Sequence, residues 1–237
     1  MPGPTVVCLL PARNEAANLP GFLESAARVC DAVVALDDGS IDDTGDLLRG
    51  SPLVAEVLAN PRRETYHGWH DGQNRNRLLE AAGRLHPDWV ISLDSDDRID
   101  LEDAKALREF LETDALPGCG YGFAYHRMWE GDTYDPDIYW VFRLFAYRPG
   151  QAFTNQRNHN VPIPTGIARA AYVRTTIRIR HYGASNEEER LGRQTKYSEA
   201  DPEGVVPTDF GGLNDRPDGE LPRWQPRGTD LPVVIPL

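Results

Sequence analysis

Three carboxylates follow directly on a short apolar run near the middle of the chain. The run covers residues 89–93, and Asp94, Asp96 and Asp97 come immediately after it. Such a run is typical of a buried parallel strand, and open α/β sheets bind ligands beyond the carboxyl ends of their strands. Asp94 and Asp96, at alternate positions, can direct two oxygens at one point, where a divalent cation offsets their repulsion and keeps positions open for phosphate oxygens. We therefore expect a metal and phosphate site here.

Two other interpretations compete for this acidic cluster. Acidic residues after a strand often form the cap and first turn of the next helix, which accounts for Asp100 but not for Asp94. A calcium loop is the second alternative, but Arg98 and Ile99 stand where an EF-hand needs a ligand and its turn glycine. The metal and phosphate interpretation explains more of the pattern.

A second acidic cluster ends an earlier apolar run. Residues 32–36 are apolar and lead into Asp37, Asp38 and Gly39. Because both clusters end strands of the same α/β half, we expect them to open on the same edge of the sheet. Asp37 or Asp38 could accept a hydrogen bond from the ring N–H of a base, although a plain turn before a helix also explains the motif. Arg75, at the start of an intervening helix, could approach the phosphates, helped by the helix N-terminus.

Length and composition limit the classes of protein that fit. The chain has 237 residues and a formal net charge of -12, so it can bury one sizeable core and lacks the basic balance of a nucleic-acid or anionic-membrane surface. Phosphate would have to be met by metal and local arginine. Three widely spaced cysteines indicate neither a disulfide framework nor a zinc site. With no basic leader and no apolar run of about 18 residues, we expect a cytoplasmic protein whose membrane contact, if any, is peripheral.

The order of the predicted elements indicates an α/β fold. Strands and helices alternate through the first half, which predicts a mainly parallel central sheet flanked by helices. After Gly118 the strands become aromatic and alternating, which predicts a mixed second half. Capping-box patterns at residues 40–43 and 185–188 predict two of the helix starts. The predicted strands cover residues 5–10, 32–36, 53–58, 89–93, 121–127, 139–147 and 172–182, and the clearest helices cover residues 19–27, 72–85, 101–113 and 185–199.

The chain divides into a body and a tail. Residues 1–200 form the predicted catalytic domain, with a ligand-binding half at 1–115 and a second half at 116–200. Residues 201–237 are dense in Pro, Gly and Asp and have no usable period. We expect them to be irregular, either wrapped on the body or disordered.

Four motifs together resemble the family 2 glycosyltransferases. They are PARNE at residues 11–15, DDGSIDDT at 37–44, RN at 75–76 and LDSDD at 93–97, in that family's order and spacing. The resemblance is specific to about Thr113. It implies a GT-A fold, a nucleotide-diphosphate sugar donor of UDP or GDP type, a Mn²⁺ or Mg²⁺ ion and, in most members, inversion at the anomeric carbon.

The resemblance also implies roles for single residues in the first half. It places Ala12 and Glu15 at the nucleotide loop, Asp38 or its neighbour Asp37 on the base, and Arg75 near the diphosphate. Asp94 and Asp96, with Ser95 between them, correspond to the family's DxD pair. Asp97 is a competing metal ligand, because some members use the last two acids of this motif.

The second half matches the family less well. His181 resembles a late histidine that completes the metal shell in some GT-A enzymes, and imidazole suits Mn²⁺, although a buried histidine bonded to a carbonyl is an equal alternative. Arg193 and Lys196 could cover the departing diphosphate, with a solvated helix face as the alternative.

An inverting transfer needs a base to take the proton of the acceptor hydroxyl. Related members often carry a His-Glu pair after an Arg-Leu-Phe strand, but here residues 158–160 read Asn-His-Asn. Asn160 cannot act as a base, so His159 becomes a candidate. The remaining candidates are the carboxylates of the loop between the two aromatic strands: Glu130, Asp132, Asp135 and Asp137.

The main functional hypothesis is a metal-dependent glycosyltransferase that acts on a carbohydrate or other hydroxyl acceptor. A nucleotidyltransferase shares this architecture but would need an early Gly-rich, basic phosphate loop, which residues 12–15 are not. A nucleotide- or sugar-binding protein that has lost its base is the other alternative. The acceptor, the base, the stereochemical outcome and the oligomeric state stay open.

Overall fold

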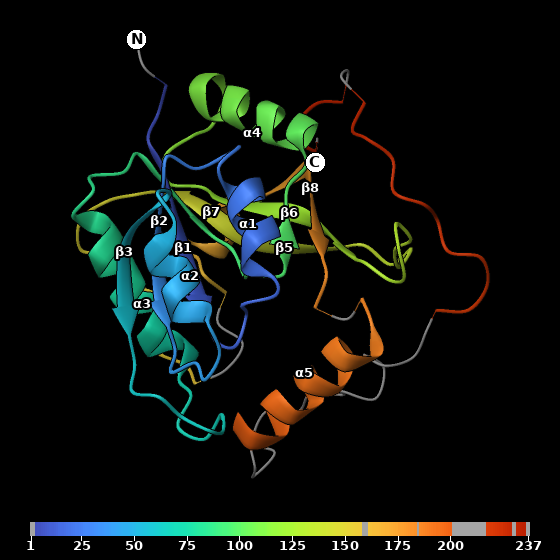
Figure 1. Ribbon diagram of the computed structural model, residues 1–237. Helices are drawn as coiled ribbons and strands as arrows, with labels where there is room; N and C mark the ends of the chain where they lie inside the picture. Colours follow the sequence, from blue (N-terminus) through green and yellow to red (C-terminus); the bar gives the residue numbers. More distant parts are fainter. Residues whose placement is uncertain (1–2, 158–160, 184, 201–216, 229–230, 236–237) are drawn as a thin grey trace.

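A single mixed sheet organises the protein in a computed structural model (Figure 1). The structure describes residues 3–157, 161–183, 185–200, 217–228 and 231–235. Within these residues the sheet has eight strands in the order β3-β2-β1-β4-β7-β6-β8-β5. The predicted α/β class with a mixed second half is confirmed.

The first half is a parallel α/β unit. β1 pairs in parallel with both β2 and β4, and β2 pairs in parallel with β3. The carboxyl ends of β1, β2 and β4 therefore lie along one edge, as the two acidic clusters required. The elements are β1 (Val6–Ala12), α1 (Leu19–Ala26), β2 (Ala32–Asp37), α2 (Thr44–Gly50), β3 (Val54–Ala59), α3 (Asp71–Gly83) and β4 (Trp89–Ser92).

The second half extends the sheet with antiparallel pairs. β7 pairs antiparallel with β4 and β6, while β6 and β8 run parallel. β5 has only two residues, too few for a sequence pattern, and its pairing sets Asp97 opposite His181. The elements are β5 (Asp97–Arg98), α4 (Leu101–Thr113), β6 (Gly120–Arg127), β7 (Tyr139–Ala146), a 3₁₀ turn (Arg169–Ala171), β8 (Tyr172–His181) and α5 (Glu187–Ala200).

Two apolar layers cover the sheet and explain the continuous apolar runs. Alternate residues of β1 join different clusters: Val6, Cys8 and Leu10 pack with α1 and α4, whereas Val7 and Leu9 pack with α3. Because both faces are covered, neither set can be polar.

Both predicted capping boxes are shifted. α2 begins at Thr44, and the Ser40 hydroxyl instead accepts from the backbone N–H of Asn14. α5 begins at Glu187, where Asn186, not Ser185, accepts from the N–H of Glu189. The pattern located each helix but not its first residue.

The described part of the tail lies along the body without forming a helix or a long strand. Trp224 donates from its indole N–H to Asp100 at 2.6 Å, and Arg227 donates to the carbonyl of Thr176 at 2.6 Å. Residues 201–216 lie outside the described residues. Among the residues that are described, no helix has the length and apolar character needed to span a membrane.

Candidate functional site

The carboxyl ends of β1, β2 and β4 open into one cavity of about 350 Å³. Its lining includes residues from both acidic clusters, and α5 adds side chains from the far end of the chain. Nine of the predicted donor or metal residues line it, and they come from six separate segments: Ala12, Glu15, Asp38, Arg75, Asp94, Ser95, Asp96, His181 and Lys196.

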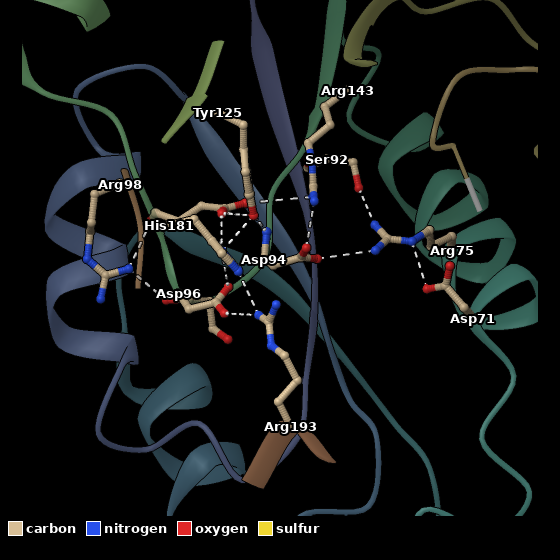
Figure 2. A network of polar contacts seen from close by, with 12 residues as sticks. Asp71, Arg75, Ser92, Asp94, Asp96, Arg98, Tyr125, Arg143, His181 and Arg193 are labelled. Carbon is tan, nitrogen blue, oxygen red and sulfur yellow. Dashed lines mark hydrogen bonds and ion pairs between the residues drawn. The ribbon is translucent and has the colours of Figure 1, made fainter. Parts of the chain in front are cut away.

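Asp94 is held by two arginines of different elements. Arg75 of α3 donates to one carboxylate oxygen at 3.2 Å, and Arg143 of β7 donates to the other at 2.8 Å (Figure 2). Arg75 also donates to Asp71 at 2.8 Å and to the Ser92 hydroxyl at 2.6 Å. Arg75 is therefore fixed in direction, because a buried guanidinium with three acceptors cannot turn without leaving one unpaired.

Asp96 points to a different group of side chains. Its Oδ2 lies 3.2 Å from a guanidinium nitrogen of Arg193, and its Oδ1 lies 3.4 Å from Nδ1 of His181. The same Arg193 nitrogen lies 2.6 Å from Nε2 of His181. Two atoms with lone pairs, one from β8 and one from the turn after β4, thus converge on one positive group, as Figure 2 shows.

Asp97 and Tyr125 lie behind His181. The Tyr125 hydroxyl donates to Asp97 at 2.7 Å, and the same carboxylate oxygen lies 3.1 Å from Nδ1 of His181. A guanidinium can only donate, so Nε2 of His181 accepts from Arg193 and the ring proton is on Nδ1, facing Asp97 and the Tyr125 hydroxyl oxygen, which lies 2.6 Å from Nδ1. Asp96, Asp97 and His181 each have one ligand atom close enough to the other two for the three to bind one metal ion. Asp97 does not line the cavity, however, and its second oxygen accepts from the N–H of Asp94 at 3.0 Å, so we assign it to orienting His181.

The environment of the site lowers the pKa of two of its carboxyl groups and raises the pKa of a third. Burial would raise the pKa of both Asp94 and Asp96, but Arg143 and Arg75 hold the pKa of Asp94 well below its usual range, and His181 and Arg193 do the same for Asp96. Burial and the Asp96 charge raise the pKa of Glu15 to about 7. Asp94 and Asp96 therefore stay ionised near neutrality, as metal or phosphate chemistry requires.

The structure separates the two aspartates that end β2. Asp37 accepts from the N–H of Ser40 at 2.9 Å and shapes the turn, in which Gly39 has a φ of 77°. Asp38 is buried and faces the cavity. Its Oδ1 accepts from the amide of Asn60, while its Oδ2 is 2.6 Å from a nitrogen of Arg63 without receiving a well-directed hydrogen bond.

Arg13 was not predicted as a site residue. It is buried, its guanidinium lies 4.0 Å from the ring centre of Tyr66, and one nitrogen donates to the carbonyl of Arg63 at 2.8 Å. Its Nε and Nη1 are buried without a hydrogen-bond partner. An unsatisfied buried donor is costly, so its position beside Asp38 indicates a binding role. The sequence signal that could have identified Arg13 is its place as a charged residue within the PARNE motif.

Two of the sequence motifs prove to be one interlocked loop pair. Asn14 has a φ of 54°, and its backbone N–H donates to the Ser40 hydroxyl. Its side-chain oxygen accepts from the N–H of Ile41 at 2.8 Å. The N–H of Glu15 donates to the Thr44 hydroxyl at 2.7 Å. The loops of PARNE and DDGSIDDT are thus joined to each other by hydrogen bonds at the cavity. Several of their polar residues make these bonds and are not free to bind a ligand.

α5 places its charged residues at the cavity. Lys196 lies 5.2 Å from the ring centre of Trp69 and 5.9 Å from that of Tyr66. Glu199 accepts from the N–H of Tyr66 at 2.9 Å. The predicted location of Lys196 near the donor site agrees with this arrangement, although its role stays a prediction.

None of the described carboxylates of the loop after β6 lines the cavity. Glu130 and Asp137 are exposed, as is Asp132. Asp135 is buried and forms an ion pair with Arg127 while accepting from the N–H of Asp137 at 3.0 Å. His159 lies outside the described residues. Among the described residues the cavity carboxylates are Glu15, Asp38, Asp71, Asp94 and Asp96.

The donor set fits a hard divalent cation. Asp96 and His181 supply oxygen and nitrogen ligands of the kind that Mn²⁺ accepts, and Asp94 lies within the same cavity. A Cβ at Gly183 would overlap both the Asp96 carboxylate and the Arg193 guanidinium, so any larger residue would force these side chains to shift.

The fold and the site define the class of the protein as a GT-A type α/β transferase. The chain belongs to the family 2 glycosyltransferases: the family model described as glycosyl transferase family 2 matches residues 7–176. The resemblance that the motifs indicated is confirmed and extends beyond Thr113.

Similar proteins include two curated relatives and several solved structures. The chain is 24% identical over 211 residues to the uncharacterized proteins Rv3786c of Mycobacterium tuberculosis and Mb3815c of Mycobacterium bovis, covering 84% of this chain and 51% of each relative. The chain therefore spans about half the length of the curated relatives it matches.

Among solved structures, the mannosyltransferase PcManGT from Pyrobaculum calidifontis, in complex with GDP-Man and Mn²⁺, matches with a TM-score of 0.55 and 16% identity over 94% of this chain and 67% of that chain. This likeness shows the fold. Glucosyl-3-phosphoglycerate synthase from Mycobacterium tuberculosis, in complex with Mg²⁺ and UDP, matches at a TM-score of 0.38 and 27% identity, over 52% of this chain and 44% of that chain.

Proposed function

We propose that this protein transfers a sugar from a nucleoside-diphosphate donor to a hydroxyl acceptor, with a divalent metal ion and with inversion at the anomeric carbon. One observation carries the proposal: the acids that end β2 and β4 line one cavity together with His181 and the cations of α3 and α5. Inversion rests on family membership alone.

Each part of the cavity suits one part of such a donor. A Mn²⁺ or Mg²⁺ ion held by Asp96 and His181, with Asp94 near it, would neutralise the charge that develops on the departing diphosphate. Arg75 orients Asp94, and Lys196 faces the cavity from α5 as a further positive charge. Asp38 and Arg13 supply an acceptor and donors at the other end, where a nucleobase would lie.

The polar atoms at that end favour uracil. Asp38 offers Oδ2 as a hydrogen-bond acceptor, because the amide of Asn60 occupies Oδ1 and the nearby Arg63 makes an ion pair with Oδ2 but no well-directed hydrogen bond. Uracil presents a single N–H between two carbonyl oxygens, which suits one carboxylate oxygen beside the free donors of Arg13. Guanine presents two adjacent donor groups and would leave one unpaired, and cytosine would set a ring acceptor against the carboxylate.

Thermal stabilisation by UDP, GDP and CDP, each with and without Mn²⁺, tests the donor site. A ligand at a hundred times its dissociation constant adds about 2.7 kcal/mol to the free energy of unfolding. We expect UDP with Mn²⁺ to stabilise the wild type most and to lose this effect in Asp96→Asn. Asn60→Ala should raise binding of GDP relative to UDP, because it frees the second oxygen of Asp38. The absence of a shift with every diphosphate would reject the proposal.

A binding protein without transferase activity is the second candidate. It is favoured by the placement of Glu130, Asp135 and Asp137, which do not line the cavity. Such a protein would bind UDP with metal yet show no transfer and no donor hydrolysis when acceptor extracts are added. Proton NMR of any product would establish the anomeric outcome.

A further inference from the structure

Arg193 lies at the point where the two best-placed metal ligands converge. One of its nitrogens is 3.2 Å from Oδ2 of Asp96 and 2.6 Å from Nε2 of His181. An atom that meets both a carboxylate oxygen and an imidazole lone pair stands where a cation would bind. Gly183 leaves room for this contact, because a Cβ there would overlap both Asp96 and Arg193.

The other arginines of the site are placed differently. Arg75 lies on α3 and Arg143 on β7, their side chains are 9% and 11% exposed, and both hold Asp94 rather than Asp96. The side chain of Arg193 is 21% exposed and belongs to α5. Arg193 can therefore be exchanged for another cation without disturbing the core, whereas Arg75 and Arg143 cannot.

We propose that Arg193 and the divalent ion compete for Asp96 and His181, so that metal binding displaces Arg193. This inference rests on the metal site of the proposed function. The displaced guanidinium stays at the cavity on α5, where it becomes available to the diphosphate. Arg193 thus exchanges one anionic partner for another as the site fills.

The contacts of α5 allow such an exchange. Arg190, Arg193, Lys196 and Glu199 recur at every third residue, so each is a neighbour of the next on the helix surface. Arg190 lies 4.8 Å from the ring centre of Trp129, and the last two residues contact the Tyr66 segment. In Figure 1, α5 lies outside the layers of helices that cover the sheet. Side-chain contacts hold it at both ends, and we expect release of Arg193 to loosen its middle.

Metal binding without any nucleotide tests the competition. We would measure the dissociation constant of Mn²⁺ by calorimetry for the wild type, Arg193→Gln and the matched control Lys196→Gln. Both substitutions remove one positive charge from the same side of α5, but only Arg193 contacts Asp96 and His181. We expect Arg193→Gln to bind Mn²⁺ on the order of tenfold more tightly than the wild type, and Lys196→Gln to gain less than about threefold from the general charge effect.

Hydrogen exchange gives a second measurement. Mn²⁺ alone should speed exchange of amides near the middle of α5 in the wild type and leave them unchanged in Arg193→Gln. Equal or weaker Mn²⁺ binding by Arg193→Gln than by the wild type or Lys196→Gln would overturn the competition and leave the proposed function intact. If the wild type and both variants bind no Mn²⁺, the metal role in the proposed function fails as well.

Discussion

Replacing Arg75 by methionine tests whether the buried network around Asp94 is a structural as well as a functional feature. Methionine preserves the length and apolar stem of the side chain but removes the guanidinium. The variant loses the hydrogen bonds to Asp71, Ser92 and Asp94. Arg143 still neutralises Asp94, so the cost falls mainly on Asp71 and Ser92, both of which are buried.

The expected loss of stability follows from the partners that Arg75→Met leaves without their arginine. Removing one member of a buried ion pair costs about 3–5 kcal/mol. Asp71 lies in the first turn of α3, where the helix dipole stabilises a negative charge, so the lower end of that range applies. A loss of about 3 kcal/mol corresponds to a fall in Tm of about 6–12 °C for a domain of this size.

Urea unfolding followed by circular dichroism would measure the change, with Arg84→Met as the matched control. Arg84 caps the C-terminus of the same helix and pairs with Glu56 at the surface, where its side chain is 55% exposed. The control should leave stability nearly unchanged, since exposed pairs contribute little. Similar midpoints for Arg75→Met and Arg84→Met would refute the reasoning that the buried network stabilises the fold.

Three further predictions concern other parts of the molecule. Burial raises the pKa of Glu15 from 4.5 to about 7, so the folded state holds a proton that the unfolded state has lost and stability falls as pH rises through this window. Glu15→Gln should raise the free energy of unfolding by up to about 3 kcal/mol at about pH 8, seen as a higher Tm, and leave it unchanged at about pH 4. Gly183→Ala should weaken calorimetric Mn²⁺ binding, because its Cβ would force the Asp96 carboxylate to shift. Trp224→Phe should cost about 1–2 kcal/mol in urea unfolding, since Asp100 loses the indole donor while a smaller aromatic ring stays in its place.

The first half of the fold follows from local patterns, because each strand is a continuous apolar run that both sheet faces bury. The second half contains features that no local pattern carries. β5 is two residues long and exists only because Asp97 and Arg98 pair with β8. The helix starts near Ser40 and Ser185 shifted because the Ser40 hydroxyl has a tertiary partner in Asn14 and because Asn186 caps α5 in place of Ser185.

The site divides in the same way. The aspartates after β2 and β4 were predictable, since strand ends in a parallel sheet share an edge. Which of Asp37 and Asp38 faces the cavity was not, because it depends on the turn at Gly39. Arg143 had a weaker signal: a lone arginine in an apolar strand that ends up buried must find a carboxylate, and its partner Asp94 is 49 positions away.

The pairing of acids with arginines explains how an acidic protein can keep several carboxylates around one cavity. Asp38, Asp94 and Asp96 each meet an arginine from a different segment, so their charges are balanced before any ligand arrives. A buried pair contributes little net stability, because desolvation offsets the attraction. Its value here is that the pairs with Arg63, Arg75 and Arg143 fix the directions of Asp38 and Asp94, while the pair on α5 is the one that we propose to open. On the proposed function, the donor site would be rigid on the side of the sheet and adjustable on the side of α5, where the metal ion would bind.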